Sequence, residues 1–325
     1  MLNHIGLGLL NQICDGLVAA QEAKIRRMCG HSSVGIAKSK LFRASIAVQQ
    51  DRPLVSISAG MLGLIAGVNH TVLGRGENTA MGVSPLWPHE ECVLSAVQLT
   101  MMCFGPDDFQ PAPLCRLPLD HPYTQLAGAL CVGQWAFLIG HELAHYLLGH
   151  LADPVPILGE SRAGIVMFLD DATKMKQQEV EADRLAGSMT KRYVDSHDDL
   201  LVREVGVVGP AIFFQWMAVC ETLMATLFAE PWASRLTSLT AEVFEADPGG
   251  TVYAHLHGHP LGSERLHAYV NEHCRSLGEL ASSILVGSGR IAEQVMADAR
   301  EPKRYEAIAK NFESIKKEFF RHRGS

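Results

Sequence analysis

The chain has 325 residues, of which 47% are hydrophobic and 19% charged, so it can bury a substantial core in one large domain or two modest ones. Its net charge of −7 argues against a general nucleic-acid-binding protein, which usually carries a strongly basic patch. The eight cysteines include no Cys-x-x-Cys pair, and the N-terminus is a poor signal peptide. Together these features predict a cytoplasmic protein with free thiols and no zinc ribbon.

The first part of the chain, residues 1–104, predicts a region of mixed helix and strand. A helical pattern covers residues 9–29, and two β-rich runs at 43–49 and 53–58 predict an antiparallel hairpin. We expect this region to belong to the same catalytic unit as the residues that follow. Prolines are then concentrated at 105–121, which predicts a surface loop between the two regions.

The most informative stretch follows an uncharged segment, 122–140, that predicts a buried helix. The helix continues into a His-Glu-x-x-His pattern at His141, Glu142 and His145, expected by chance only about 0.04 times in a chain of this composition. Residues four apart share a helix face, so both histidines can bind one zinc ion. Glu142 would then lie beside the metal, placed to accept a proton from a bound water. The alternative is a core helix whose histidines only contact their neighbours.

A zinc site of this kind needs a third protein ligand. His150 lies five residues after His145, which does not fit the three-histidine motif, so we interpret it as a helix-end residue that faces solvent or the last carbonyls. A helix predicted over 172–195 places Glu179 and Asp183 on one face. We expect Glu179 to bind the zinc and Asp183 to orient a zinc-bound histidine. The alternative is a solvated acidic helix face.

Helices dominate the second half of the sequence. A short strand is predicted at 165–169, and further helices are predicted at about 198–204, 208–229, 262–276 and 278–299. The apolar runs at 122–140 and 205–220 could be mistaken for membrane spans, which need about 20 apolar residues. We interpret both as core helices and expect no membrane contact.

Three histidines alternate at His255, His257 and His259. In an extended segment, alternate residues point to the same side, so these side chains could form a second metal site. No acidic or cysteine partner accompanies them nearby. The other interpretation is that only His259 has an active-site role and that the remaining two are loop residues.

The last segment, residues 300–325, predicts an amphipathic helix. Its apolar residues are spaced three or four apart and form a narrow stripe: Tyr305, Ile308, Phe312, Ile315 and Phe319. Lysines and arginines occupy the other positions. Such a helix can pack on its own domain, bind a partner or a second copy of the chain, or lie on a membrane surface.

The order and local spacing of these motifs resemble a known family, the gluzincin zinc metallopeptidases typified by the CAAX prenyl protease and the heat-shock protease HtpX. The matching positions form three groups: His141 with His145, Glu179 with Asp183, and His259-Pro260 with Arg265. A weaker likeness to the phage-exclusion Lit-type and ImmA/IrrE-type peptidases points to a soluble branch.

The resemblance implies a role for each matching residue. The two histidines of the helix motif and Glu179 would hold one zinc ion, and Glu142 would be the general base. Asp183 and Arg265 would support the ligands. The resemblance also implies that His259 lies near the scissile carbonyl, where it would stabilise the oxyanion or gate the open zinc position.

We therefore expect a mainly helical α+β protein with a small antiparallel sheet, a zincin-like metallopeptidase fold and a metal-binding core over 122–299. The expected activity is zinc-dependent hydrolysis of peptide bonds in a protein or peptide. Two alternatives remain. One is a zincin-fold protein that binds a partner without cutting it, in bacterial stress or phage defence. The other is a latent enzyme, covered by 255–260 or by the N-terminal region until a partner arrives.

Overall fold

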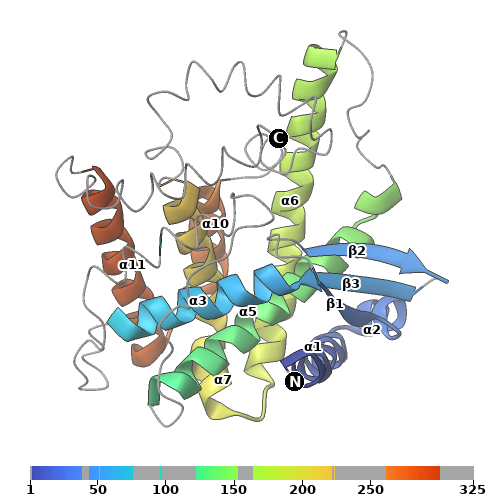
Figure 1. Ribbon diagram of the computed structural model, residues 1–325. Helices are drawn as coiled ribbons and strands as arrows, with labels where there is room; N and C mark the ends of the chain where they lie inside the picture. The colour runs from blue at the N-terminus through green and yellow to red at the C-terminus, as the bar shows by residue number, and fades with distance from the viewer. Residues whose placement is uncertain are drawn as a thin grey trace.

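The computed structural model describes residues 2–38, 44–50, 52–75, 96, 122–152, 164–221, 223 and 261–300. Within these ranges the protein is mainly helical, with one small sheet at one end (Figure 1). This confirms the mainly helical α+β prediction. Three predicted features lie outside the described residues: the proline-rich loop at 105–121, the histidines at 255–259 with Pro260, and the stripe of the C-terminal segment.

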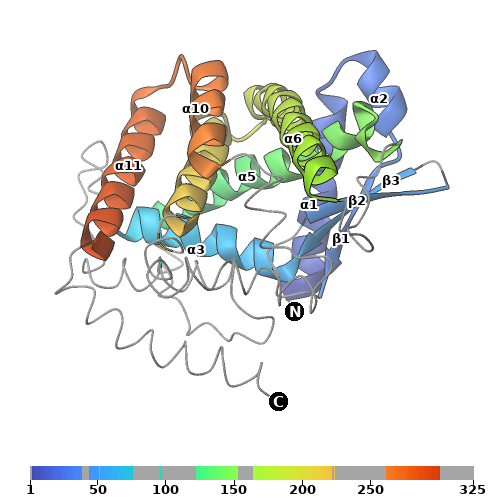
Figure 2. The same ribbon diagram turned by 90° about the horizontal axis from the view of Figure 1, so that it is seen from above.

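Helix α5 (Pro122–Leu147) runs through the middle of the protein, between α3 and α6 (Figure 2). Its residues are buried almost without interruption from Leu126 to Ala144, which explains why the segment is apolar on every face. The helices described around it are α1 (Leu2–Ala19), α2 (Ala23–Cys29), α3 (Ala59–Arg75), α6 (Gly164–Asp195), α7 (Leu200–Val205), α10 (Gly262–His273), α11 (Glu279–Arg300), a helix over 209–221 and the short turns η2 (His150–Ala152) and η3 (Gly206–Val208).

The sheet has the strand order β1-β3-β2, with β1 at Ser33–Ala37, β2 at Ala44–Gln49 and β3 at Arg52–Ser58. β2 and β3 are antiparallel, with Gln49 opposite Arg52, and Gln50 directly after β2 has a φ of 51°, so the predicted hairpin is confirmed. β1 pairs with β3 in parallel. The sheet is therefore mixed, and the prediction of an antiparallel sheet was wrong in this respect. A hairpin has a local sequence signal, whereas the β1–β3 pair joins strands that are not consecutive.

Two other boundaries differ from the sequence prediction. The helix predicted over 9–29 is two helices, α1 and α2, separated at residues 20–22. The strand predicted at 165–169 is wrong, because α6 already begins at Gly164. A short apolar run fits a buried strand and a helix segment equally well, and here the long helix that follows extends backwards through it.

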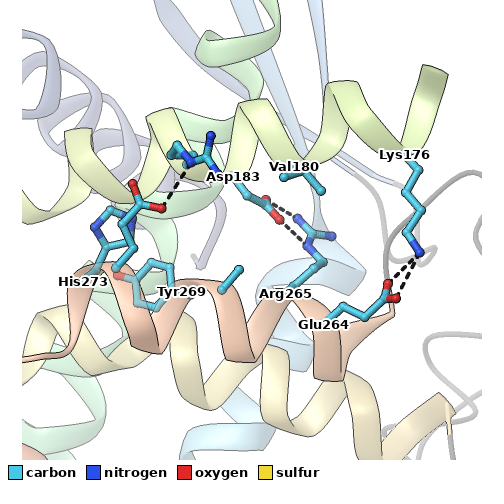
Figure 3. Close-up of a pocket in the computed structure, with 10 residues that line it drawn as sticks. Lys176, Val180, Asp183, Glu264, Arg265, Tyr269 and His273 are labelled. Carbon is cyan, nitrogen blue, oxygen red and sulfur yellow. Dashed lines mark hydrogen bonds and ion pairs between the residues drawn. The ribbon is translucent and has the colours of Figure 1, made fainter. Parts of the chain in front are cut away.

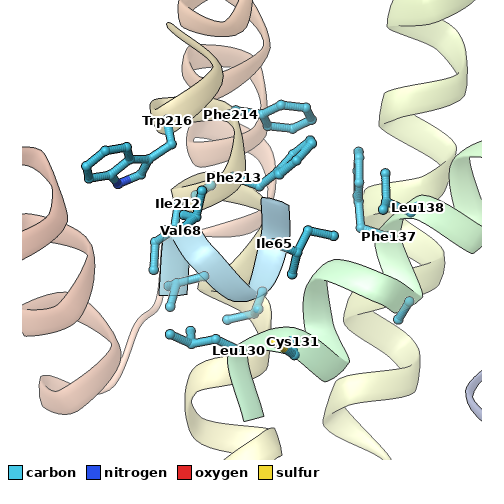
Figure 4. Close-up of a cluster of buried hydrophobic side chains, with 14 of the residues drawn as sticks. Ile65, Val68, Leu130, Cys131, Phe137, Leu138, Ile212, Phe213, Phe214 and Trp216 are labelled. Carbon is cyan, nitrogen blue, oxygen red and sulfur yellow. The ribbon is translucent and has the colours of Figure 1, made fainter. Parts of the chain in front are cut away.

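An aromatic cluster fixes α5 at the point where the metal motif begins (Figure 4). The ring of Phe137, one turn before His141, makes edge contacts with Phe214 at 5.2 Å and with Tyr269 at 5.7 Å between centroids. Such pairs contribute about 0.5–1.5 kcal/mol each beyond the burial of their surface. The cluster therefore holds the helix over 209–221 and α10 against the same turn of α5.

A buried amide pair sets the register between α3 and α5. The side chain of Asn69 donates to Gln134 at 2.7 Å, and Gln134 donates back at 3.0 Å and also to the carbonyl of Gly209 at 3.1 Å. Asn69 and Gln134 are almost completely buried. Buried amides are costly unless they are paired, so a shift of either helix along its axis would leave these groups without partners.

Two helical stretches are long and apolar enough to cross a membrane by length and composition alone, namely Pro122–Leu147 and Leu200–Glu221. In the folded protein 83% of the most apolar window of Pro122–Leu147 is buried, and 72% of that of Leu200–Glu221. Core helices of soluble proteins pass the same test, so the finding is weak evidence for a membrane span.

The cysteines that the structure describes are free, and those in helices α1, α2 and α5 are deeply buried. Burial raises the pKa of Cys14 and of Cys131 to about 12. Both thiols are therefore protonated at neutral pH and are weak nucleophiles. They act as small apolar core residues.

A close backbone approach between α5 and η3 gives a test of this packing. A Cβ at Gly133 would lie 1.9 Å from the carbonyl oxygen of Gly206, whereas a Cβ at the exposed Gly128 of the same helix would meet nothing within 4 Å. We expect Gly133→Ala to lower the free energy of unfolding by about 3 kcal/mol and Gly128→Ala to raise it by about 0.5–1 kcal/mol. Urea denaturation of both variants measures the difference. Equal stability of the two would contradict the packing of η3 on α5.

Candidate metal centre

Two histidines of α5 and one glutamate of α6 converge on a single point. The Nε2 atoms of His141 and His145 lie 3.1 Å apart. The carboxylate of Glu179 lies 3.2 Å from Nε2 of His141 and 3.3 Å from Nε2 of His145. Among the residues described, this is the one group of three or more such side chains that can hold a metal ion. The sequence prediction placed the same three residues together.

Small residues allow α5 and α6 to approach closely enough for this convergence. On α5, Gly140 and Ala144 are buried next to the motif histidines, and on α6, Ala182 and Ala186 have no exposed surface. A Cβ on Gly140 would already lie 3.5 Å from the backbone of Ala186. Because these facing positions of α5 and α6 carry only small residues, the side chain of Glu179, one turn before Ala182, reaches the two histidines.

The three donors fit a tetrahedral metal ion. Metal–nitrogen bonds of about 2.0–2.1 Å at tetrahedral angles place neighbouring donors roughly 3.3 Å apart, close to the 3.1–3.3 Å between these side chains. Two imidazoles and one carboxylate form a donor set that hydrolytic metal sites use. The side chains are only 10–15% exposed, so an ion held here would be shielded from most solvent.

The electrostatics of the centre favour a positive charge. Burial alone lowers the pKa of His141, but the carboxylates of Glu179 and Asp183 outweigh it and raise this pKa to about 10. Without a metal, the site therefore holds a proton on His141 at neutral pH. The negative charge that attracts a proton also attracts a divalent cation, and metal binding must release that proton.

Asp183 lies behind His141 and is itself clamped by Arg265. Its Oδ1 is 2.9 Å from Nδ1 of His141, a hydrogen-bonding distance with the ring turned from the ideal donor direction. Arg265 donates two hydrogen bonds to the carboxylate, at 2.5 and 2.7 Å, and its guanidinium stacks on Phe214 at 4.6 Å from the ring centre. Burial would raise the pKa of Asp183, but Arg265 and His141 reverse the shift, so the carboxylate stays charged.

Helix α10 carries Arg265 and is tied to α6 along a pocket of about 270 Å³ (Figure 3). Lys176 pairs with Glu264 at 2.8 Å at one end of this pocket. This pair is about half exposed and contributes about 0.2–1 kcal/mol at most. The buried Asp183–Arg265 pair is the stronger constraint, because removing one partner of such a pair costs about 3–5 kcal/mol.

The N-terminus of α10 is fixed against the helix over 209–221. A Cβ on Gly262 would lie 2.6 Å from the backbone nitrogen of Ala218, so this position needs glycine. The backbone N–H of Gly262 donates to the carboxylate of Glu221 at 3.0 Å. Arg265 follows within one turn, so its position is set by this contact.

Two further residues were predicted to act at the site. Glu142 lies on α5 directly after His141 and is 9% exposed, so the carboxyl group is enclosed in the same part of the fold. His259 lies outside the described residues. The catalytic roles of both residues remain predictions.

His150 lies just after the end of α5 but does not face solvent, so this part of our interpretation from the sequence was wrong. Its side chain is 8% exposed, and its Nδ1 lies 3.0 Å from Nδ1 of His145. This contact is on the opposite edge of the His145 ring from Nε2, so His150 is not a third ligand. Nε2 of His150 lies 3.4 Å from the carboxylate of Glu181. Burial lowers the pKa of His150, which favours the neutral form of its ring.

No family model, no curated protein and no solved structure matches this chain.

The assignment of Glu179 as third ligand predicts a loss of metal when it is replaced. We expect protein purified without added metal to keep about one divalent ion per chain and Glu179→Ala to lose most of it, because two imidazoles alone bind weakly. Asp195→Ala is the control, since Asp195 is an exposed acid at the end of α6 that pairs with Lys191. Elemental analysis after dialysis measures all three proteins. Equal metal in wild type and Glu179→Ala would remove Glu179 from the site.

Proposed function

We propose that the protein is a zinc-dependent peptidase with a zincin-like fold. The observation that carries the proposal is the buried convergence of His141, His145 and Glu179, with Glu142 next to the first ligand. These three residues would hold the ion. A zinc ion bound there supplies Lewis acidity and lowers the pKa of a water molecule toward neutrality.

In this proposal Glu142 moves the protons. Its carboxylate accepts a proton from the attacking water and then gives that proton to the amine that leaves. Glu142 directly follows the ligand His141 on α5, so its carboxylate would lie beside a bound water. Burying a carboxyl group is costly. A protein that only bound a partner would have no use for a base at this position.

Other residues orient the reaction. Asp183, which is held by Arg265, contacts the ring of His141 and would thereby direct its Nε2 toward the other donors. On the basis of the family resemblance, His259 stabilises the oxyanion of the tetrahedral intermediate. We also propose a cytoplasmic location, with which the free buried thiols are compatible.

The sheet provides a place for an extended peptide. In the described part of the chain β2 is an edge strand, most of its residues are exposed, and it lies against α5. An edge strand presents unpaired backbone groups, to which a peptide can add as a further strand. Such pairing would hold a peptide bond in a fixed orientation relative to the helix motif. We therefore propose a protein or peptide substrate.

Substitution of the base separates catalysis from metal binding. We expect Glu142→Gln to keep its zinc and to lose about 10²–10⁴-fold in cleavage rate, because the amide has the same shape but cannot accept a proton. His145→Ala is expected to lose both zinc and cleavage. Cleavage is measured on a library of peptides from a digested proteome, read by mass spectrometry, and zinc by elemental analysis.

Full cleavage by Glu142→Gln would contradict the assignment of the base. A wild-type protein that holds zinc and cuts no peptide in the library would favour the alternative of a zincin-fold protein that binds without cutting.

A further inference from the structure

The ring of His145 is held from behind by a second histidine, although that residue is not a metal ligand. His150 contacts His145 at Nδ1, and Glu181 contacts the far side of His150. We propose that His150 and Glu181 are positioning residues that orient His145 for metal binding. The inference rests on the proposed metal centre. Asp183 and Arg265 support His141, whereas His150 and Glu181 would give His145 a separate support.

The placement of protons follows from the contacts. Nε2 of His145 faces His141 and Glu179, so this atom must carry a lone pair if it binds a metal. The single proton of a neutral ring is then on Nδ1, which lies 3.0 Å from Nδ1 of His150. His150 accepts at that atom and therefore carries its own proton on Nε2, which points to Glu181 at 3.4 Å. Each ring nitrogen thus has one role.

The outer end of this chain of contacts is also held. The second carboxylate oxygen of Glu181 accepts a hydrogen bond from the side-chain amide of Gln177 at 2.9 Å, one turn earlier on α6. Glu181 is 43% exposed, whereas the side chain of His150 is 8% exposed. Water can replace part of the Glu181 contact, so we expect His150 to contribute more than Glu181 to the position of His145.

The backbone after α5 explains how His150 can contact the ring of His145, which lies only five residues earlier in the chain. The helix ends at Leu147, and Gly149 has a φ of 75°, a left-handed conformation that favours glycine. Its N–H bonds to the carbonyl of Tyr146 at 3.2 Å, which closes the last turn. The chain then turns back, and η2 begins at His150. The ring centres of His150 and His145 lie 5.1 Å apart.

Two replacements of His150 test the hydrogen bond separately from the packing. Phenylalanine keeps a flat ring but has no acceptor. Asparagine keeps an acceptor oxygen near the position of Nδ1. Zinc affinity is measured by competition with a chromophoric chelator, and the visible spectrum of the cobalt-substituted protein reports the geometry around the ion. Thermal melts of the metal-free proteins check that both variants fold. His267→Phe, at an exposed histidine on α10, is the matched control.

We expect His150→Phe to weaken zinc binding by about 10–100-fold and to change the cobalt spectrum, as loss of an outer hydrogen bond to a ligand does. We expect His150→Asn to recover most of the affinity, and His267→Phe to match wild type. Wild-type affinity and an unchanged spectrum in His150→Phe would overturn the inference. A wild-type protein that binds neither zinc nor cobalt would instead overturn the proposed metal centre.

Discussion

The contact between α5 and α6 is the constraint on which the candidate metal centre depends. One helix supplies two donors and the other supplies the third, so the site exists only while the two helices keep their register. A slip of one helical turn moves a side chain by about 5.4 Å, more than the distance between any two of the donors. Small residues bring the helices together, and the amide pair of Asn69 and Gln134 fixes α5 against α3 on its other side.

The same contact gathers negative charge in a place with little water. Two carboxylates, those of Glu179 and Asp183, lie against His141, and Asp183 is also paired with Arg265. A buried negative charge is stable only with a counter-charge. A proton on His141 or a bound cation can add to that counter-charge, so affinity for metal and affinity for protons have one cause. Arg265 keeps Asp183 ionised, which makes α10 a part of the centre although it supplies no ligand.

Local patterns in the sequence predicted the donors, and contacts made after a chain reversal were missed. The spacing of His141 and His145 and of Glu179 and Asp183 is regular on a helix, so helix geometry was enough to group them. His150 was misplaced because its contact depends on the left-handed Gly149, which directs the chain back over the helix end. The Leu-Leu-Gly-His sequence did carry a signal, since glycine just after a helix often adopts this conformation.

The elements of the fold also divide into those with a local sequence signal and those that depend on distant contacts. The hairpin of β2 and β3 has a local signal and was predicted, whereas the parallel pairing of β1 with β3 depends on how α1 and the strands pack together. The start of α6 was missed because an apolar run of five residues does not distinguish a strand from a buried helix. Glycines such as Gly133 and Gly262 gave no clear signal alone, because the close approach that requires them involves residues far along the chain.

X-ray absorption at the zinc edge, on protein purified without added metal, tests the central claim most directly. The account predicts nitrogen and oxygen ligands at about 2.0–2.2 Å with the outer-shell scattering of two imidazole rings. Sulfur at about 2.3 Å, or an oxygen shell without imidazole, would show that the ion binds elsewhere and would contradict the assignment of His141, His145 and Glu179.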